Sequence, residues 1–162
     1  MRIKGKKPVE ILVIDDDKQV AETLVEWLSR KGYQATAANG GREGINMFKK
    51  GDFKLVITDL AMPDVNGMEV LETIKSIDKR VTVVMITGFG TIEKAHIAIK
   101  KGAYDFIPKP VDFKMIEVVI NRALEHHSLF SQLSMSRRLI LALIISLPFW
   151  LILGIILSLV WK

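Results

Sequence analysis

The sequence predicts an α/β protein built on a five-stranded parallel sheet, followed by a C-terminal membrane helix. Two observations support this prediction. Through residue 126, short runs of β-branched and other apolar residues alternate with longer segments of helical periodicity, which is typical of parallel strands joined by crossover helices. From Leu139 to Trp161 there is no charged side chain, and a helix of that length can cross a hydrocarbon core of about 30 Å.

Five apolar runs are expected to form the strands. They are residues 9–14, 33–37, 54–58, 81–86 and 104–107. The third and fourth runs are nearly continuous in Val and Ile, as expected for central strands that are covered on both faces. In the first helix, Val20, Leu24 and Trp27 fall on one stripe that is expected to face the core.

Three helices are expected to end at the same kind of sequence, two cations followed by a glycine. These ends are Arg30-Lys31-Gly32, Lys49-Lys50-Gly51 and Lys100-Lys101-Gly102. Cations stabilise the negative end of a helix dipole, and glycine can adopt the left-handed cap conformation. Their recurrence before predicted strands supports the alternation of strands and helices.

Four segments are predicted along the chain. They are a basic N-terminal extension (1–8), the α/β domain (9–126), a linker that ends in an arginine pair (127–138) and the membrane helix (139–161). Pro148 interrupts the last segment. A spanning helix remains possible because Ser146 could satisfy the carbonyl freed by the proline, and a bend at Pro148 would instead give a re-entrant helix. Arg137-Arg138 on the domain side predicts that the domain lies in the cytoplasm.

The charge balance argues against a nucleic-acid partner, although the net charge is +5. Arg137, Arg138 and Lys162 flank the apolar segment, and without these three, 20 basic residues remain against 18 acidic ones. Such a balance has no electrostatic footprint for DNA or RNA. The sequence contains no cysteine, which excludes disulfides and thiolate metal sites.

Reactive side chains follow four of the predicted strands. Asp15-Asp16-Asp17 follow the first strand, Asp59 the third, Thr87 the fourth and Lys109 the fifth. The carboxyl ends of parallel strands meet at one crevice, where ligands bind. Carboxylates gathered there would repel one another unless a cation lay among them. Magnesium fits, because it accepts carboxylates and keeps water and phosphate oxygens as further ligands.

This set of groups predicts phosphoryl transfer, in which catalysis consists mostly of positioning and charge neutralisation. Asp59 is expected to be the nucleophile. Lys109 and the metal would balance the phosphoryl charge, and the Thr87 hydroxyl would donate to a phosphoryl oxygen.

Residues 9 to about 126 resemble the receiver domain of bacterial two-component response regulators. The resemblance rests on Ile14-Asp15-Asp16, Thr-Asp-Leu-Ala-Met-Pro-Asp at 58–64 with Gly67, Ile86-Thr87-Gly88, and Ile-Pro-Lys-Pro at 107–110. Two departures are small: Gly88 stands where alanine is usual, and Phe106 where tyrosine is usual. The resemblance implies a flavodoxin-like, doubly wound (β/α)5 fold.

The same resemblance implies the ligands, the switch and the partner. Magnesium would be held by Asp15, Asp16, Asp59 and the backbone carbonyl of Ala61. Thr87 and Phe106 would form a switch in which the ring turns inward as Thr87 moves toward the phosphoryl group. A cis peptide is implied before Pro110. The phosphodonor would be a sensor histidine kinase or a phosphotransfer protein.

Two positions are expected to set the lifetime of the phosphoryl group. In receivers, the residues two after the acceptor aspartate and two after the threonine border the line along which water attacks. Here these residues are Ala61 and Phe89. Neither can orient a water molecule, so self-hydrolysis is expected to be slow.

Output is expected to occur through contact, because the linker leads directly to the apolar segment. By the resemblance, the contact face is formed by the fourth helix, fifth strand and fifth helix, roughly residues 91–125. It would serve a homodimer or a membrane-protein partner. We expect no enzyme acting on a separate substrate, only a protein that catalyses its own phosphorylation and slow dephosphorylation.

Three alternatives remain open from the sequence. Asp15 to Asp17 could simply cap a helix. The chain could be a membrane-tethered pseudo-receiver that acts as a scaffold. It could also be a phosphatase of the haloacid dehalogenase type, which places an aspartate nucleophile after its first strand. That family requires Thr or Val two residues after its second aspartate, and Gln19 stands there.

Overall fold

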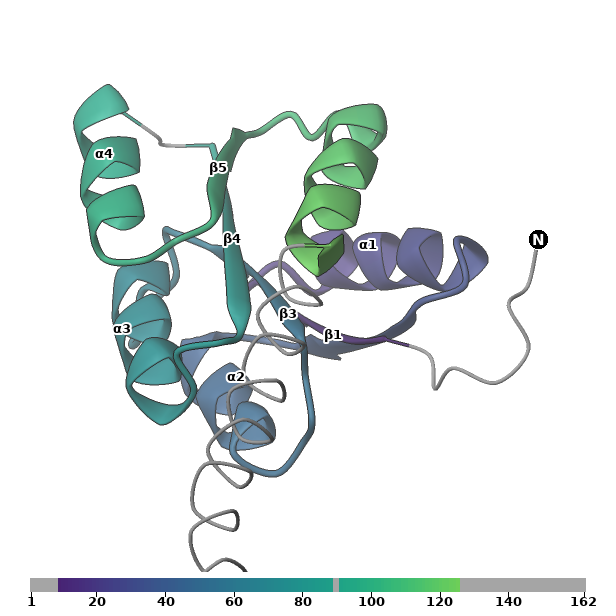
Figure 1. The fold of residues 1–162 in the computed structure, drawn as a ribbon, viewed down its shortest axis with the longest axis horizontal. Coiled ribbons are helices and arrows are strands. Elements are labelled where there is room, and N and C mark those ends of the chain that lie inside the picture. Colours follow the sequence, from purple (N-terminus) through teal and green to yellow (C-terminus); the bar gives the residue numbers. More distant parts are fainter. Residues whose placement is uncertain (1–8, 89–90, 126–162) are drawn as a thin grey trace, which may run out of the picture. The chain divides into compact units, whose positions relative to one another are not determined.

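The structure, a computed structural model, describes residues 9–88 and 91–125 (Figure 1). Three predicted features therefore lie outside the described residues: the N-terminal extension, Phe89, and the linker with the membrane helix at 139–161. Within the described ranges, no helix combines the length and the apolar character needed to cross a bilayer.

Five parallel strands form one sheet in the order β2-β1-β3-β4-β5. They are β1 (Glu10–Ile14), β2 (Gln34–Ala38), β3 (Leu55–Asp59), β4 (Thr82–Thr87) and β5 (Asp105–Pro108). This order is that of the flavodoxin-like doubly wound fold, so the predicted fold class of the domain is confirmed.

Each strand begins one residue later than its apolar run. The shift reflects pairing with the neighbouring strand, which extends the ladder to the polar residues that end β3 and β4. Asp59 lies opposite Ile86, and Thr87 lies opposite Pro108. Asp59 and Thr87 are thus the last residues of their strands, whereas Asp15, Asp16 and Lys109 directly follow theirs.

Helices cover both faces of the sheet (Figure 1). They are α1 (Lys18–Arg30), α2 (Gly41–Phe48), α3 (Gly67–Ile77), α4 (Ile92–Lys100) and a last helix that covers residues 113–125 of the described chain. One core lies under α2, α3 and α4, and the other under α1 and the last helix. Every residue of β3 and β4 is buried, as predicted for central strands.

The predicted left-handed glycine occurs at two of the three helix ends. Gly32 and Gly102 adopt the left-handed conformation, with φ of 91° and 98°. Gly51 has another role, because a Cβ added there would lie 2.4 Å from the ring of Phe53. At that position glycine makes room for an aromatic side chain.

Trp27 packs against the core under α1 and the last helix, as predicted, but it is only partly buried. Its ring stacks on Phe113 of the last helix, with 5.2 Å between the ring centroids. The Lys31 ammonium lies 5.5 Å from the centroid of the Trp27 ring and donates to Glu117 at 2.8 Å. Trp27 therefore provides a contact between α1 and the last helix.

Gly67, the first residue of α3, lies directly against the end of β3. A Cβ at this position would come within 2.0 Å of the Asp59 carbonyl oxygen. The Gly67 amide donates to the Leu60 carbonyl at 3.0 Å. The absence of a side chain thus lets α3 approach the strand that carries Asp59.

Replacing Gly67 by Ala should therefore lower the free energy of unfolding by about 1–3 kcal/mol, the usual cost of forcing atoms into a packed site. Urea unfolding of the 162-residue chain measures it. Gly88→Ala is the matched control: the nearest heavy atom to its added Cβ is Lys109 Cβ at 3.9 Å, so its stability should stay within about 0.5 kcal/mol of the parent. Equal losses in both variants would contradict the close-approach argument.

Candidate functional site

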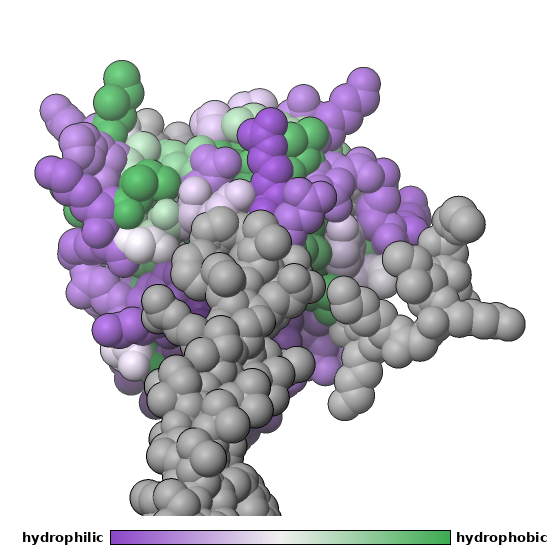
Figure 2. All heavy atoms as spheres, viewed as in Figure 1, coloured by the Kyte–Doolittle hydropathy of each residue, from purple (hydrophilic) through white to green (hydrophobic). Residues whose placement is uncertain are grey.

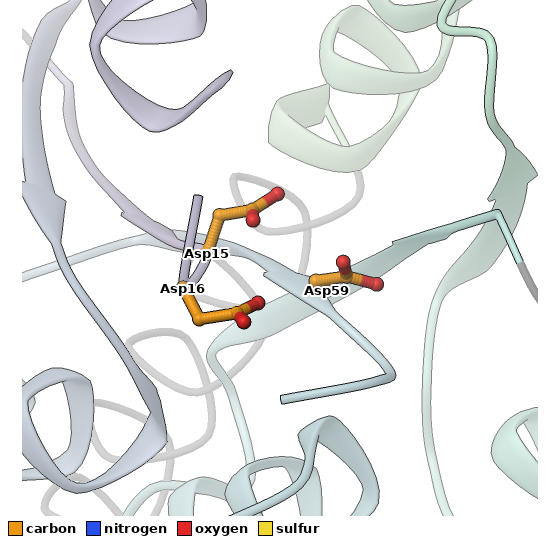
Figure 3. Close-up of side chains that lie close together, drawn as sticks. All are labelled: Asp15, Asp16 and Asp59. Atoms are coloured by element: carbon orange, nitrogen blue, oxygen red, sulfur yellow. The ribbon is translucent and has the colours of Figure 1, made fainter. Parts of the chain in front are cut away.

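Three carboxylates meet at the carboxyl edge of the sheet. Asp15 and Asp16 follow β1, and Asp59 ends β3, its neighbour in the sheet. Each of the three has a carboxylate oxygen within 4.8 Å of the others, and Figure 3 shows them gathered at one point. Asp15 and Asp59 are 5% and 8% exposed, whereas Asp16 is open to solvent.

Asp17, the third aspartate after β1, is a helix cap rather than a member of the carboxylate cluster. Asp17 caps α1, because its carboxylate accepts from the amides of Gln19 at 2.9 Å and Val20 at 3.2 Å. The Asp17 amide in turn donates to Asp15 Oδ1 at 2.9 Å. The capping alternative therefore holds for Asp17 alone, and the cap itself helps to orient Asp15.

Lys109 joins the two buried carboxylates. Its ammonium nitrogen lies 2.8 Å from Asp15 Oδ2 and 2.8 Å from Asp59 Oδ2. Partial burial lowers the pKa of Lys109, but its hydrogen bonds to Asp15 and Asp59 outweigh burial, and the pKa is raised from its ordinary value. Lys109 thus remains a cation at neutral pH.

The backbone around Lys109 is fixed as well. Its amide donates to the Thr87 carbonyl at 2.8 Å, which ties the end of β5 to the end of β4. The peptide between Lys109 and Pro110 is cis, as the resemblance implied.

Both oxygens of the Asp59 carboxylate are engaged. Oδ2 accepts from Lys109, and Oδ1 accepts from the Ala61 amide at 3.3 Å. These two donors hold the carboxylate in one orientation at the surface of the crevice. Such positioning is what a nucleophile in phosphoryl transfer requires.

The charges of the cluster favour a divalent cation. The cluster holds three carboxylates and one ammonium, which pairs with Asp15 and Asp59, so two negative charges remain uncompensated. The donor set consists of oxygen atoms alone, and magnesium prefers such ligands. Asp15, Asp16 and Asp59 would hold the ion. The predicted contribution of the Ala61 carbonyl stays a prediction.

Thr87 and Phe106 lie where the strands predicted them. Thr87 is buried at the end of β4, one position beyond the partner of Asp59. Phe106 of β5 is partly buried against the core under α2, α3 and α4. Their roles as hydroxyl donor and aromatic switch stay predictions.

One ion pair beside the site was missed by sequence reasoning. Arg42 of α2 donates to both oxygens of Asp64, from Nε at 2.7 Å and from Nη2 at 2.8 Å. The hydrogen bond from Arg42 lowers the pKa of Asp64. Asp64 has a φ of 71°, so the pair also holds an uncommon turn. No local pattern joins two exposed residues that are 22 positions apart.

The family comparison identifies one family for most of the chain. Residues 11–121 match the family described as "Response regulator receiver domain". The haloacid dehalogenase alternative gains no support from this match.

Curated relatives include larger proteins. The transcriptional regulatory protein ZraR of Escherichia coli K12 is 34% identical over 122 residues, which are 75% of this chain and 28% of ZraR. CusR of the same strain is 31% identical over 105 residues, 65% of this chain and 46% of CusR. The chain therefore spans about a quarter to a half of these relatives. Their names refer to transcription, while the expectation of no nucleic-acid partner for this chain stays a prediction.

Solved structures agree with the fold. A response regulator receiver domain protein from Clostridium thermocellum has a TM-score of 0.72 and 32% identity, covering 75% of this chain and 98% of that one. NtrX from Brucella abortus, solved in complex with ADP, has a TM-score of 0.74 and 32% identity, covering 79% of this chain and 30% of NtrX.

Two adjacent aspartates provide a test of the cation site. Magnesium at ten times its Kd should stabilise the parent by about 1.4 kcal/mol, measured as a rise in the urea midpoint. Asp16→Asn should abolish this gain, because it removes a ligand from an exposed position. Asp17→Asn should retain it, because asparagine caps helices as well as aspartate does. A magnesium effect that survives in Asp16→Asn would place the ion elsewhere.

Proposed function

Since the chain belongs to the response regulator receiver family, we propose that it accepts a phosphoryl group on Asp59 from a sensor histidine kinase or a phosphotransfer protein. The reaction depends on magnesium, and the signal passes on through phosphorylation-dependent contact with other proteins. The observation that supports Asp59 most directly is the Lys109 ammonium, which lies 2.8 Å from both Asp15 and Asp59.

The residues divide the work as follows. An oxygen of Asp59 attacks the phosphorus while the bond from phosphorus to the donor nitrogen breaks. Lys109 offsets the negative charge on the phosphoryl group, and the Thr87 hydroxyl donates to one of its oxygens. Asp15, Asp16 and Asp59 would hold magnesium, which would supply positive charge beside the transferring group. The chain acts on no separate substrate and catalyses only its own phosphorylation and slow dephosphorylation.

In this proposal, two residues set the lifetime of the phosphoryl group and two others form the switch. Ala61 and Phe89 offer no polar atom to orient an attacking water, so the phosphoryl group is long-lived. Thr87 and Phe106 form the switch. Phe106 packs only partly into the core, which leaves its ring room to change position.

The contact surface for output is the face of α4, β5 and the last helix. Large apolar side chains are exposed there: Ile92 is 90% exposed, Ile97 and Ile99 are each 47%, and Met115 and Val118 are 43% and 48%. Figure 2 shows such hydrophobic side chains among hydrophilic ones over α4. Exposed apolar surface of this kind suits protein contact. The partner is a second copy of this chain or a membrane protein.

Attachment to the membrane is also part of the proposal. Residues 139–161 contain no charged side chain, which suits a spanning or re-entrant helix. The pair Arg137-Arg138, on the domain side of this segment, supports a cytoplasmic receiver by the positive-inside rule. A regulator confined to the membrane meets its partners within that surface.

The first test identifies the phosphoacceptor. Acetyl phosphate with magnesium should add one phosphoryl group to the 162-residue chain, and Asp59→Asn should stay unlabelled because it removes the attacking carboxylate. Intact mass spectrometry measures the label. Asp64→Asn, an exposed aspartate in the same loop, is the matched control and should be labelled. Label on Asp59→Asn would move the acceptor elsewhere, and a parent that is never labelled would favour the scaffold alternative.

The second test concerns the membrane. Deleting residues 137–162 should release the chain from membranes and leave a protein that acetyl phosphate still labels, since the apolar run is removed and the site is untouched. Fractionation with a high-salt wash measures attachment. A truncated chain that stayed with the membrane pellet would assign attachment to another surface. Protease access to a C-terminal tag in intact cells distinguishes a spanning helix, which exposes the tag outside, from a re-entrant one.

A further inference from the structure

An open cavity of about 360 Å³ lies between α1 and the start of the last helix. Its walls are mostly apolar and come from β1, α1, β3, β4, the loop after β5 and the last helix. The apolar lining includes Val13, Val20, Leu24, Ile57, Ile86, Val111 and Phe113. Voids larger than a water molecule are few in protein interiors, and this volume lies at the lower end of the range for small-molecule sites.

The cavity shares its walls with the phosphorylation site. Asp15, Asp59 and Lys109 line it together with the apolar residues. The acceptor carboxylate and the ammonium that balances phosphoryl charge therefore stand beside an apolar space. A donor whose phosphoryl group reaches Asp59 could place a neighbouring apolar group in that space.

The rim is suited to hold an apolar group. Phe113 lines the cavity and is 38% exposed, and stacking on Trp27 fixes the orientation of its ring. Val20 and Val111 also line the cavity and are partly buried. Covering these side chains with an apolar ligand removes their surface from water, which is favourable.

We propose that this cavity receives the acyl group of a small-molecule phosphodonor, an acyl phosphate whose acyl group is aromatic or branched and larger than acetyl. The proposal rests on the proposed function of Asp59. In the reaction, an Asp59 oxygen forms a bond to phosphorus. The bond between phosphorus and the acyl oxygen breaks, and the carboxylate leaves with the electron pair. The products are aspartyl phosphate and a free carboxylate.

The test compares two donors on the purified 162-residue chain with magnesium. Benzoyl phosphate should label Asp59 with a second-order rate constant roughly 10-fold or more above that of acetyl phosphate, because apolar pockets discriminate by about that factor for each added methylene. The ratio of the two rate constants is the readout, so that a loss of folded protein lowers both rates and leaves the ratio unchanged.

A matched pair of substitutions locates the effect. Val20→Phe fills the cavity and should reduce the ratio to about 1, by loss of the roughly 10-fold preference. Val118→Phe makes the same change at an exposed position outside the cavity and should keep the parent ratio. An equal ratio in the parent and in Val20→Phe would overturn the cavity proposal.

A second measurement is independent of the chemistry. Benzoylphosphonate, a non-transferring analogue, should shift the methyl resonances of Val20, Leu24 and Val111 and leave those of Val118 unchanged. Unshifted cavity methyls would overturn the proposal.

Failure of the proposed function and failure of the cavity proposal give different results. If neither donor labels Asp59, the proposed function fails and this inference with it. If acetyl phosphate labels Asp59 without any preference for benzoyl phosphate, only the cavity proposal fails.

Discussion

The bridge from the Lys109 ammonium to Asp15 and Asp59 is the interaction on which the rest of the site depends. Both carboxylates are nearly buried and lie at the carboxyl ends of neighbouring strands, where their charges repel each other. One cation at 2.8 Å from each offsets that repulsion. Breaking such a pair by removing one partner is costly, because it leaves a buried charge without compensation. The Lys109 side chain thus allows two carboxylates to lie close together at the carboxyl edge of the sheet.

Several contacts of the fold hold the partners of this bridge in position. The register of β3 and β4 places Asp59 and Thr87 at the same edge, and the Thr87 carbonyl fixes the backbone of Lys109. Gly67 lets α3 approach the end of β3. These contacts involve backbone atoms, so they do not depend on the identity of the surrounding surface side chains.

Much of this arrangement could be predicted, because buried parallel strands are rich in Val and Ile and because chemistry in open α/β sheets lies at strand ends. That reasoning correctly predicted one cluster at the strand ends, formed by Asp15, Asp16, Asp59 and Lys109. The choice of Asp16 rather than Asp17 for the carboxylate cluster came only from the family resemblance, since physically it depends on the residue at which α1 begins. The Arg42 pair with Asp64 depends on how α2 packs. The cavity depends on the volumes of side chains from six elements, which no local pattern records.

The long separation of the bridge partners affects how the protein is made. Lys109 is 94 residues from Asp15 and 50 from Asp59, and it follows an edge strand of the sheet. During translation, the acidic half of the site leaves the ribosome well before its counter-charge. Non-local contacts of this kind form late. A nascent chain that stops before residue 105 therefore lacks both β5 and Lys109, so that the counter-charge of Asp59 arrives only with the last strand of the sheet.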